Sequence, residues 1–177
     1  TVITDTVSQL QQIVVEEQAG RKTKGTKRAG DWGTMTKRDW GEVASLMKEW
    51  MINYRDLSKL GMNIVFIAQD RTFNLSDEDD DEEGSLSPEI GPALSPSIAK
   101  TLNAAVSVIG NTFIRSRTIK KEVGGKKKEI EKIEYCLRIG PNPLYITKVR
   151  KPRSVEVTPV MVDPTFEDIM DIIKGEV

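Results

Sequence analysis

The sequence contains no histidine and a single cysteine, Cys136. The lack of histidine excludes a His-based metal site and a histidine general base. One cysteine cannot form a disulfide within the chain, so we expect Cys136 to be a small, buried apolar residue of a reduced cytosolic protein. No apolar run is long enough to span a bilayer and no signal peptide is visible, so we expect no membrane partner.

The chain also has no large excess of positive or negative charge. The 177 residues include 26 Lys and Arg against 27 Asp and Glu, for a formal net charge of −1. The charges are segregated, however, with basic residues gathered in three places and an acidic run at 77–83. The net charge therefore does not exclude a nucleic-acid partner. The acidic run does not have the spacing of a calcium-binding loop, and we expect it to be a solvated, disordered insert.

The phosphate-binding motif G-x-x-x-x-G-K-[ST] does not occur in the chain. The first residue is Thr1 rather than Met, and residues 1–7 form a β-branched run that predicts a buried strand. Because the chain starts inside a predicted strand, we expect further residues to precede Thr1 in the whole protein.

Apolar spacing predicts alternating strands and helices in the first part of the chain. A continuous apolar run at 63–68 predicts a strand that is buried on both faces, as central parallel strands are. Gly61 supplies the C-terminal stop of the helix before it. The predicted helices are 8–17, with Leu10, Ile13 and Val14 on one face, and 38–60. A helix between two such strands is typical of a βαβ unit with a parallel sheet.

The later part of the chain reads as a long loop followed by a short helix and several strands. We expect the loop at 72–96 and a helix at 97–103, which is capped by Ser95 or Ser97. Alternating and continuous apolar runs predict strands at 105–117, 135–139 and 144–149, with a hairpin tip at Gly124-Gly125. A terminal helix is predicted at 166–173, with Thr165 as its N-cap.

Two polar residues follow the predicted parallel strands where each strand ends. Asp5 ends the first strand and Gln69 follows the second. The carboxyl ends of parallel strands meet at one edge of a sheet, where ligands bind. In P-loop NTPases an aspartate at this place holds Mg²⁺, and a neutral amide can bond a γ-phosphate or an attacking water. The alternatives are a turn or helix-cap aspartate and an ordinary polar residue at a strand end.

Two groups of cations could contact phosphates. Lys148 and Arg150 alternate on the predicted strand 144–149 and so point the same way past its end, where they could stabilise the charge of a transferring phosphate. A Gly-rich basic segment at 18–37, which we expect to be a mobile loop, suits contacts to a phosphate backbone. Its candidate DNA-binding residues are Arg21, Lys22, Lys24, Lys27 and Arg28. Ordinary solvated basic surfaces are the alternative in both cases.

The order of these segments is similar to that of phage RecA-like P-loop ATPases of the AAA nucleotide-binding type, which are encoded beside single-strand annealing and recombination functions. The resemblance runs from Thr1 to about Ser154 and rests on TVITDTVSQLQQ, DWGEV, NIVFIAQDR and YITKVRKPRS in this order. It implies an α/β fold: a partial RecA-like P-loop NTPase core with a mostly parallel sheet flanked by helices, and antiparallel strands at its C-terminal side. Residues 1–154 would form this core and 155–177 a C-terminal extension with a short helix.

The resemblance also implies roles for residues. Asp5 matches the Walker B aspartate that holds Mg²⁺, and Thr6 matches the hydroxyl residue after it. Gln69 matches the glutamine that senses the γ-phosphate of ATP. Lys148 and Arg150 match paired cations that reach the ATP of an adjacent subunit, and 18–37 lies where a first DNA-binding loop lies. The implied cofactors are ATP and Mg²⁺.

The resemblance implies a phage-encoded protein in the bacterial cytoplasm. Its partners would be single-stranded DNA, further copies of itself in a ring or filament, and a phage annealing or single-strand-binding protein. The full-length protein would be a DNA-stimulated ATPase, whereas this chain without a phosphate-binding loop would be inactive alone. The alternative is a non-catalytic RecA-fold remnant that binds single-stranded DNA or a recombination partner.

Overall fold

The computed structural model describes residues 1–22, 35–73, 88–123 and 126–176, and these residues divide between two compact units. The first unit comprises Thr1–Phe73 and Ile90–Val106, and the second comprises Asn74–Glu89 and Ser107–Val177. No helix among the described residues has both the length and the apolar character needed to cross a membrane.

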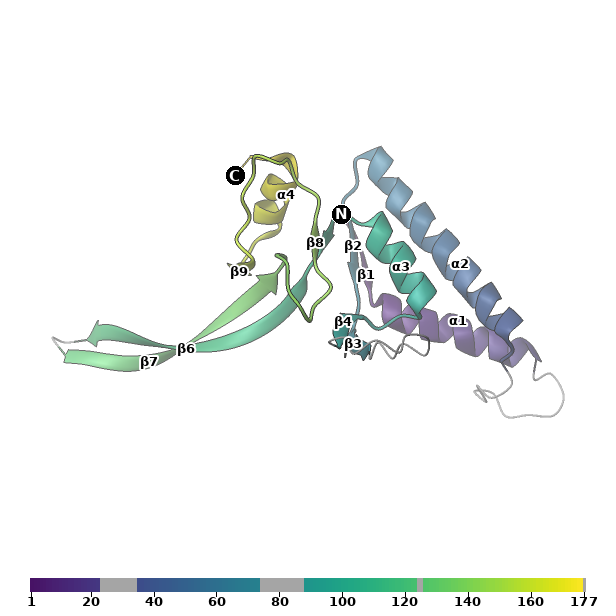
Figure 1. The fold of residues 1–177 in the computed structure, drawn as a ribbon, viewed down its shortest axis with the longest axis horizontal. Helices are drawn as coiled ribbons and strands as arrows, with labels where there is room; N and C mark the ends of the chain where they lie inside the picture. The colour runs from purple at the N-terminus through teal and green to yellow at the C-terminus, as the bar shows by residue number, and fades with distance from the viewer. Residues whose placement is uncertain (23–34, 74–87, 124–125, 177) are drawn as a thin grey trace, which may run out of the picture. The chain divides into compact units, whose positions relative to one another are not determined.

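The first unit packs three helices beside a pair of parallel strands (Figure 1). Strand β1 (Val2–Asp5) pairs in parallel with β2 (Ile64–Ile67), so the predicted strand–helix–strand order is confirmed. The helices are α1 (Val7–Lys22), α2 (Lys37–Asp56) and α3 (Pro96–Ala105). Short strands β3 (Asp70–Phe73) and β4 (Glu89–Pro92) pair with each other. They lie at both ends of the predicted loop 72–96, whose acidic run 77–83 falls outside the described residues.

Helix α2 carries the core of this unit because Val43, Met47 and Met51 recur at a spacing of four residues and so share one face. Val7 and Val15 of α1 and Ile98 of α3 belong to the same buried cluster. Helix α2 starts at a capping box formed by Thr36 and Asp39. A 3-10 helix (Leu57–Leu60) extends it to Gly61, whose φ of 76° is the left-handed stop that the sequence predicts.

Three expectations for this unit were wrong in part. Helix α1 continues to Lys22, so residues 18–22 of the predicted loop 18–37 are helical, because Gln18 and Ala19 are buried on the α1 face that meets α2. Ile13 lies off that face and is 52% exposed. Strand β2 is covered on one face only: Phe66 packs against the core, whereas Ile67 is 42% exposed.

The second unit is antiparallel. Its strands are β5 (Val108–Ile109), β6 (Asn111–Val123), β7 (Lys126–Arg138), β8 (Lys148–Val149) and β9 (Val160–Val162). Strand β7 lies between β6 and β9, and β5 pairs with β8. The parallel pairing of a RecA-like sheet is therefore shown for one pair of strands, β1–β2, and the expected antiparallel strands on the C-terminal side are present.

The remaining predicted elements of the second unit are present with changed bounds. The paired ends Val123 and Lys126 agree with a hairpin at Gly124-Gly125, which itself lies outside the described residues. The strand predicted at 144–149 is reduced to β8, because the Asn142 side chain accepts the Leu144 and Tyr145 amides in a turn. Helix α4 (Phe166–Lys174) begins at the predicted cap, Thr165. Cys136 is buried, as expected. Residues 155–177 contribute β9 and α4, and the boundary at 154 stays a prediction.

Candidate nucleotide site

The carboxyl ends of β1 and β2 lie side by side in the first unit. The register pairs Asp5 with Ile67, and Gln69 follows two residues later. Asp5 and Gln69 are both exposed. The expectation that two neighbouring parallel strands end in these polar residues is therefore confirmed, while their chemical roles stay predictions.

Asp5 is placed by the change from strand to helix immediately after it. Strand β1 ends at Asp5 and α1 begins at Val7, with a cis peptide bond between Asp5 and Thr6. The Thr6 hydroxyl oxygen accepts a hydrogen bond from the backbone N–H of Gln9 at 3.1 Å and so caps the helix. The helix dipole at the start of α1 favours negative charge at this end of the sheet.

Gln69 is held at its backbone by two elements. Its N–H donates to the Ser8 hydroxyl oxygen at 3.2 Å, and its carbonyl oxygen accepts the Ala93 N–H at 2.7 Å. The first contact ties Gln69 to the first turn of α1, and the second ties it to the segment after β4. These bonds leave the side-chain amide at the surface, at the same end of the sheet as Asp5.

The residues at this end are compatible with a nucleotide-bound Mg²⁺. Among the described residues no group of three or more acidic, cysteine or histidine side chains could hold a metal alone. Mg²⁺ needs no such cage, because it commonly binds through one or two carboxylates together with substrate phosphates and waters. The exposed carboxylate of Asp5 beside a helix start fits that arrangement.

The model of one protein family, described as an AAA domain, matches residues 1–151. The chain belongs to this family. Membership indicates a nucleotide-binding domain of the ATPase type, which typically works with Mg²⁺. No curated protein and no solved structure matches this AAA domain.

The paired cations of the AAA domain lie in its second unit. Lys148 is half-buried on β8, whereas Arg150 is exposed and lies just beyond the strand, with its N–H donating to the Ser107 carbonyl oxygen at 2.8 Å. Burial, together with the positive charge of Arg150, lowers the pKa of the Lys148 ammonium group. The expected strand alternation does not extend to Arg150, because the strand ends first, but the two cations remain close enough to repel.

The predicted DNA-binding residues are described only in part. Arg21 and Lys22 form the last residues of α1 rather than a loop. Lys24, Lys27 and Arg28 lie outside the described residues, so that part of the prediction stays a prediction.

Sequence reasoning missed two polar contacts that build this end of the first unit. Ser8 supports Gln69, and the Gln11 side-chain oxygen accepts the Ser95 N–H at 2.9 Å, which ties α1 to the start of α3. Ser8 and Gln11 are three residues apart and so share one face of α1. That spacing was visible in the sequence, but neither partner could be read from it.

Proposed function

We propose that this AAA domain is part of a RecA-like ATPase of phage origin that acts on single-stranded DNA in recombination or strand annealing. The observation that carries the proposal is the pairing of β1 with β2, which brings Asp5 and Gln69 to one end of a parallel pair. That end of a parallel sheet is where nucleotides bind in α/β folds.

Asp5 has the place and the chemistry of the magnesium-binding residue. Its carboxylate is exposed next to the start of α1, where anionic phosphates are favoured. When bound, Mg²⁺ neutralises charge on the β- and γ-phosphates. Thr6 supports this role by ending β1 and capping α1, which orients the chain around Asp5. ATP is the nucleotide that we propose.

Gln69 is proposed to report the state of the γ-phosphate. Its side-chain amide can donate to a phosphate oxygen or orient a water. Its backbone is bonded to Ser8 on one side and to Ala93 on the other. A shift of Gln69 toward a phosphate would therefore pull on α1 and on the segment that leads into α3, and it would move β3, which begins at Asp70.

Lys148 and Arg150 are proposed to act on a nucleotide held by a neighbouring copy of the protein, in a ring or filament. Two cations held close together stabilise the charge that develops on a transferring phosphoryl group. The pKa of Lys148 is lowered, first by burial and then by the positive charge of Arg150. An anion that approached both cations would favour the charged form of Lys148.

The proposed DNA contacts are Arg21 and Lys22 at the end of α1, together with Lys24, Lys27 and Arg28. Cations at a helix C-terminus followed by a basic, Gly-rich segment suit a phosphate backbone. A phage annealing or single-strand-binding protein is a further proposed partner, and the cytoplasm of a bacterial host is the proposed location.

The second candidate is a non-catalytic RecA-like module that binds single-stranded DNA or a recombination partner. The absence of G-x-x-x-x-G-K-[ST] from the chain favours it. The two candidates differ in one measurable property, which is Mg²⁺-dependent ATP hydrolysis by the full-length protein.

Asp5→Asn in the full-length protein tests the proposal. We expect the rate of Mg²⁺-dependent ATP hydrolysis to fall at least about 100-fold, because the carboxylate that orients the nucleotide-bound metal is lost. Asp70→Asn is the matched control, since it makes the same change at an exposed aspartate next to Gln69 and should leave the rate unchanged. Hydrolysis that survives Asp5→Asn would exclude the magnesium role, and a wild-type protein without hydrolysis would favour the binding module.

A further inference from the structure

The β6–β7 hairpin forms an arm whose two faces carry different charge. Both strands have 13 residues, but β9 pairs only with Cys136–Arg138 of β7, so most of the hairpin projects from the rest of its unit (Figure 1). Residues directly opposite each other share a face, and the faces alternate along the strands. We call one set of alternating positions the cationic face. Its cross-strand pairs with described side chains are Arg115–Glu134, Arg117–Lys132 and Ile119–Ile130.

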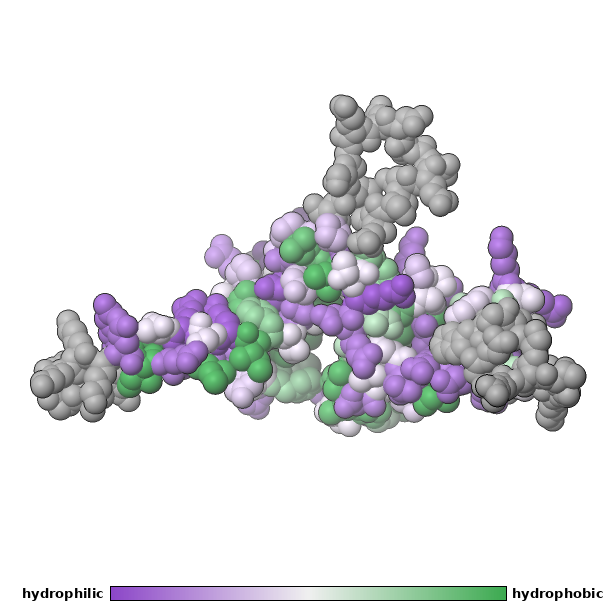
Figure 2. All heavy atoms as spheres, turned by 90° about the horizontal axis from the view of Figure 1, so that it is seen from below, coloured by the Kyte–Doolittle hydropathy of each residue, from purple (hydrophilic) through white to green (hydrophobic). Residues whose placement is uncertain are grey.

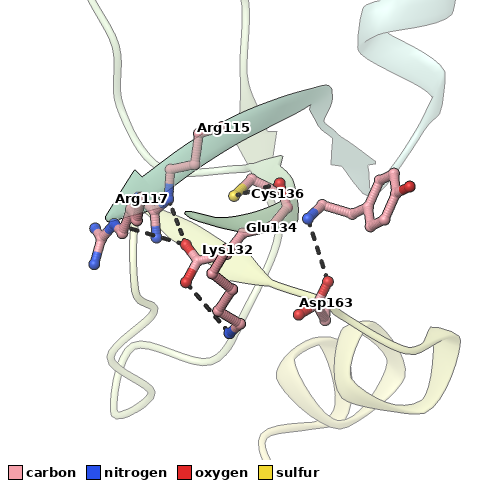
Figure 3. A network of polar contacts seen from close by, with 7 residues as sticks. Arg115, Arg117, Lys132, Glu134, Cys136 and Asp163 are labelled. Atoms are coloured by element: carbon pink, nitrogen blue, oxygen red, sulfur yellow. Dashed lines mark hydrogen bonds and ion pairs between the residues drawn. The ribbon is translucent and has the colours of Figure 1, made fainter. Parts of the chain in front are cut away.

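At the inner end of this face, the Glu134 carboxylate forms ion pairs with three cationic side chains (Figure 3). Glu134 accepts from Arg115 Nε at 2.7 Å, while Lys132 Nζ lies 3.4 Å and Arg117 Nε 3.7 Å from its carboxylate oxygens. The Glu134 side chain is only 9% exposed, whereas those of Arg117 and Lys132 are 57% and 48% exposed. Arg115 therefore neutralises Glu134, and the other two cations are in excess.

Further out, the described pairs of the cationic face carry no carboxylate. Arg117 pairs directly with Lys132. Like charges directly opposite each other destabilise a sheet. The next pair outward, Ile119 with Ile130, is apolar, and each of these side chains is 39% exposed.

The opposite face carries carboxylates beside its lysine, so the excess of cations is not a general property of the arm. Its outer pairs with described side chains are Thr118–Glu131 and Lys120–Glu129. Ser116 Oγ donates to Glu131 at 2.5 Å, and Lys120 Nζ lies 3.6 Å from Glu129. Ile114, Ile133 and Tyr135 give the inner part of this face an apolar surface. Figure 2 shows hydrophilic and apolar side chains gathered in separate zones along the arm, at the left of the view.

We propose that the cationic face of the arm binds the phosphate backbone of a nucleic acid. Exposed cations along an extended ribbon, here Arg117 and Lys132, match a linear polyanion, whose counterions they displace. The contact would read no bases, because the exposed groups of this face are cations and aliphatic side chains rather than amides. It lacks the large aromatic residues that anchor proteins at a bilayer surface. The proposal rests on the proposed function only for the expectation that the partner is a nucleic acid. Binding by the arm requires no nucleotide.

The double variant Arg117→Gln/Lys132→Gln tests the proposal. Binding to a labelled oligothymidine and to a duplex of the same length is measured by fluorescence anisotropy over a salt series without nucleotide. Losing two phosphate contacts should weaken binding about tenfold and flatten the slope of log K against log salt by about 1.4 for the single strand or about 1.8 for the duplex. The strand type with the larger change is the one that the arm binds. The melting temperature should change little. The variant removes the like-charge pair along with the longer contacts of Arg117 and Lys132 to Glu134, and Arg115 still neutralises Glu134.

The control is Lys120→Gln, which removes a positive charge from the opposite face. This variant should keep the wild-type slope. Equal losses in both variants, or an unchanged slope in the first, would overturn the proposal. It would also be overturned if vesicles of phosphatidylserine, but neither oligonucleotide, bound in a way that Arg117→Gln/Lys132→Gln abolishes.

The outcome is separable from that of the proposed function. Asp5→Asn should bind both oligonucleotides like the wild type without nucleotide, because Asp5 lies in the first unit. If Asp5→Asn leaves hydrolysis intact while Arg117→Gln/Lys132→Gln weakens binding to the oligonucleotides, the proposed role of Asp5 is refuted. The proposed role of the arm is then supported.

Discussion

The parallel strands β1 and β2 and the antiparallel strands β6 and β7 present their polar groups in different ways. β1 and β2 have four residues each and offer Asp5 and Gln69 at or beyond their ends. β6 and β7 have 13 residues each and offer charges along their length. The position of a polar group at a strand end is set by where the strand stops. The positions of polar groups along a two-stranded ribbon are set by which residues are paired across the strands.

The two regions also differ in the contacts that stabilise them. The β1–β2 pair is covered on one face by Phe66 and Ala68, which pack against the cluster that contains Met47 and Met51. The described part of the arm beyond β9 is held by cross-strand pairs, and Ile114 and Ile133 there are 66% and 59% exposed. We therefore expect substitutions to have unequal effects on the free energy of unfolding, and three pairs of variants test this from the largest effect to the smallest.

Met51→Ala against Ile114→Ala should give the largest difference. Met51 is completely buried, so its truncation should lower the free energy of unfolding by about 2–5 kcal/mol through lost burial and a cavity. Ile114→Ala on the arm should change it by less than about 0.5 kcal/mol. Urea unfolding followed by circular dichroism measures both values. A cost for Ile114→Ala as large as that for Met51→Ala would mean that the arm is packed against a further surface in solution.

The capping boxes of α2 and α4 provide a matched comparison between the units. Thr36 and Thr165 cap these helices in the same way, with Asp39 and Asp168 as the reciprocal partners. Replacing either threonine by alanine should cost about 1 kcal/mol of unfolding free energy. The cost should be greater for Thr36→Ala, because Asp39 is 2% exposed and water cannot replace the lost bond. Equal urea midpoints for the two variants would contradict this.

The smallest effect expected is on the acid stability of the arm. The hydrogen bond from Arg115 holds the pKa of Glu134 below its usual value. A carboxyl group with a lowered folded pKa stabilises the fold above its unfolded pKa, and this stabilisation is lost as the pH falls through the folded pKa. Thermal melts of the wild type should therefore lose stability below about pH 4.5, and Glu134→Gln should lower the melting temperature at neutral pH while flattening that acid limb. Glu129→Gln, at an exposed ion pair of the opposite face, is the control. If Glu134→Gln still loses melting temperature at low pH as the wild type does, that loss comes from other carboxyl groups.

The end of the β1–β2 pair that carries Asp5 and Gln69 was predictable, because the sequence patterns that indicate it are local. The apolar run before Gln69 and the β-branched run before Asp5 each predict a strand and its end. That the two strands are neighbours follows from the helix between them. The contact of Ser8 with the Gln69 backbone could not be predicted, since it joins residues 61 positions apart.

The arm was predictable as a hairpin but not as a charged surface. Gly124-Gly125 between two β-rich segments indicates the turn, yet one shift of register would move every charge to the other face. The observed register places Arg117 opposite Lys132 and Lys120 opposite Glu129. Strand 144–149 was predicted too long for a related reason, because a side chain of Asn142 competes for the backbone N–H groups that a strand partner would take.

By itself the sequence determined the helices with strong apolar spacing, the caps at Thr165 and Gly61, and the polar residues that follow two strands, because these depend on neighbours within a few positions. Only the tertiary structure decided that β2 is open on one face, that Lys148 is half-buried while Arg150 is exposed beyond the end of the strand, and that Arg115, Arg117 and Lys132 share one face of the arm. These features depend on which distant segment pairs or packs with which, and the free energy of that choice is spread over the whole chain.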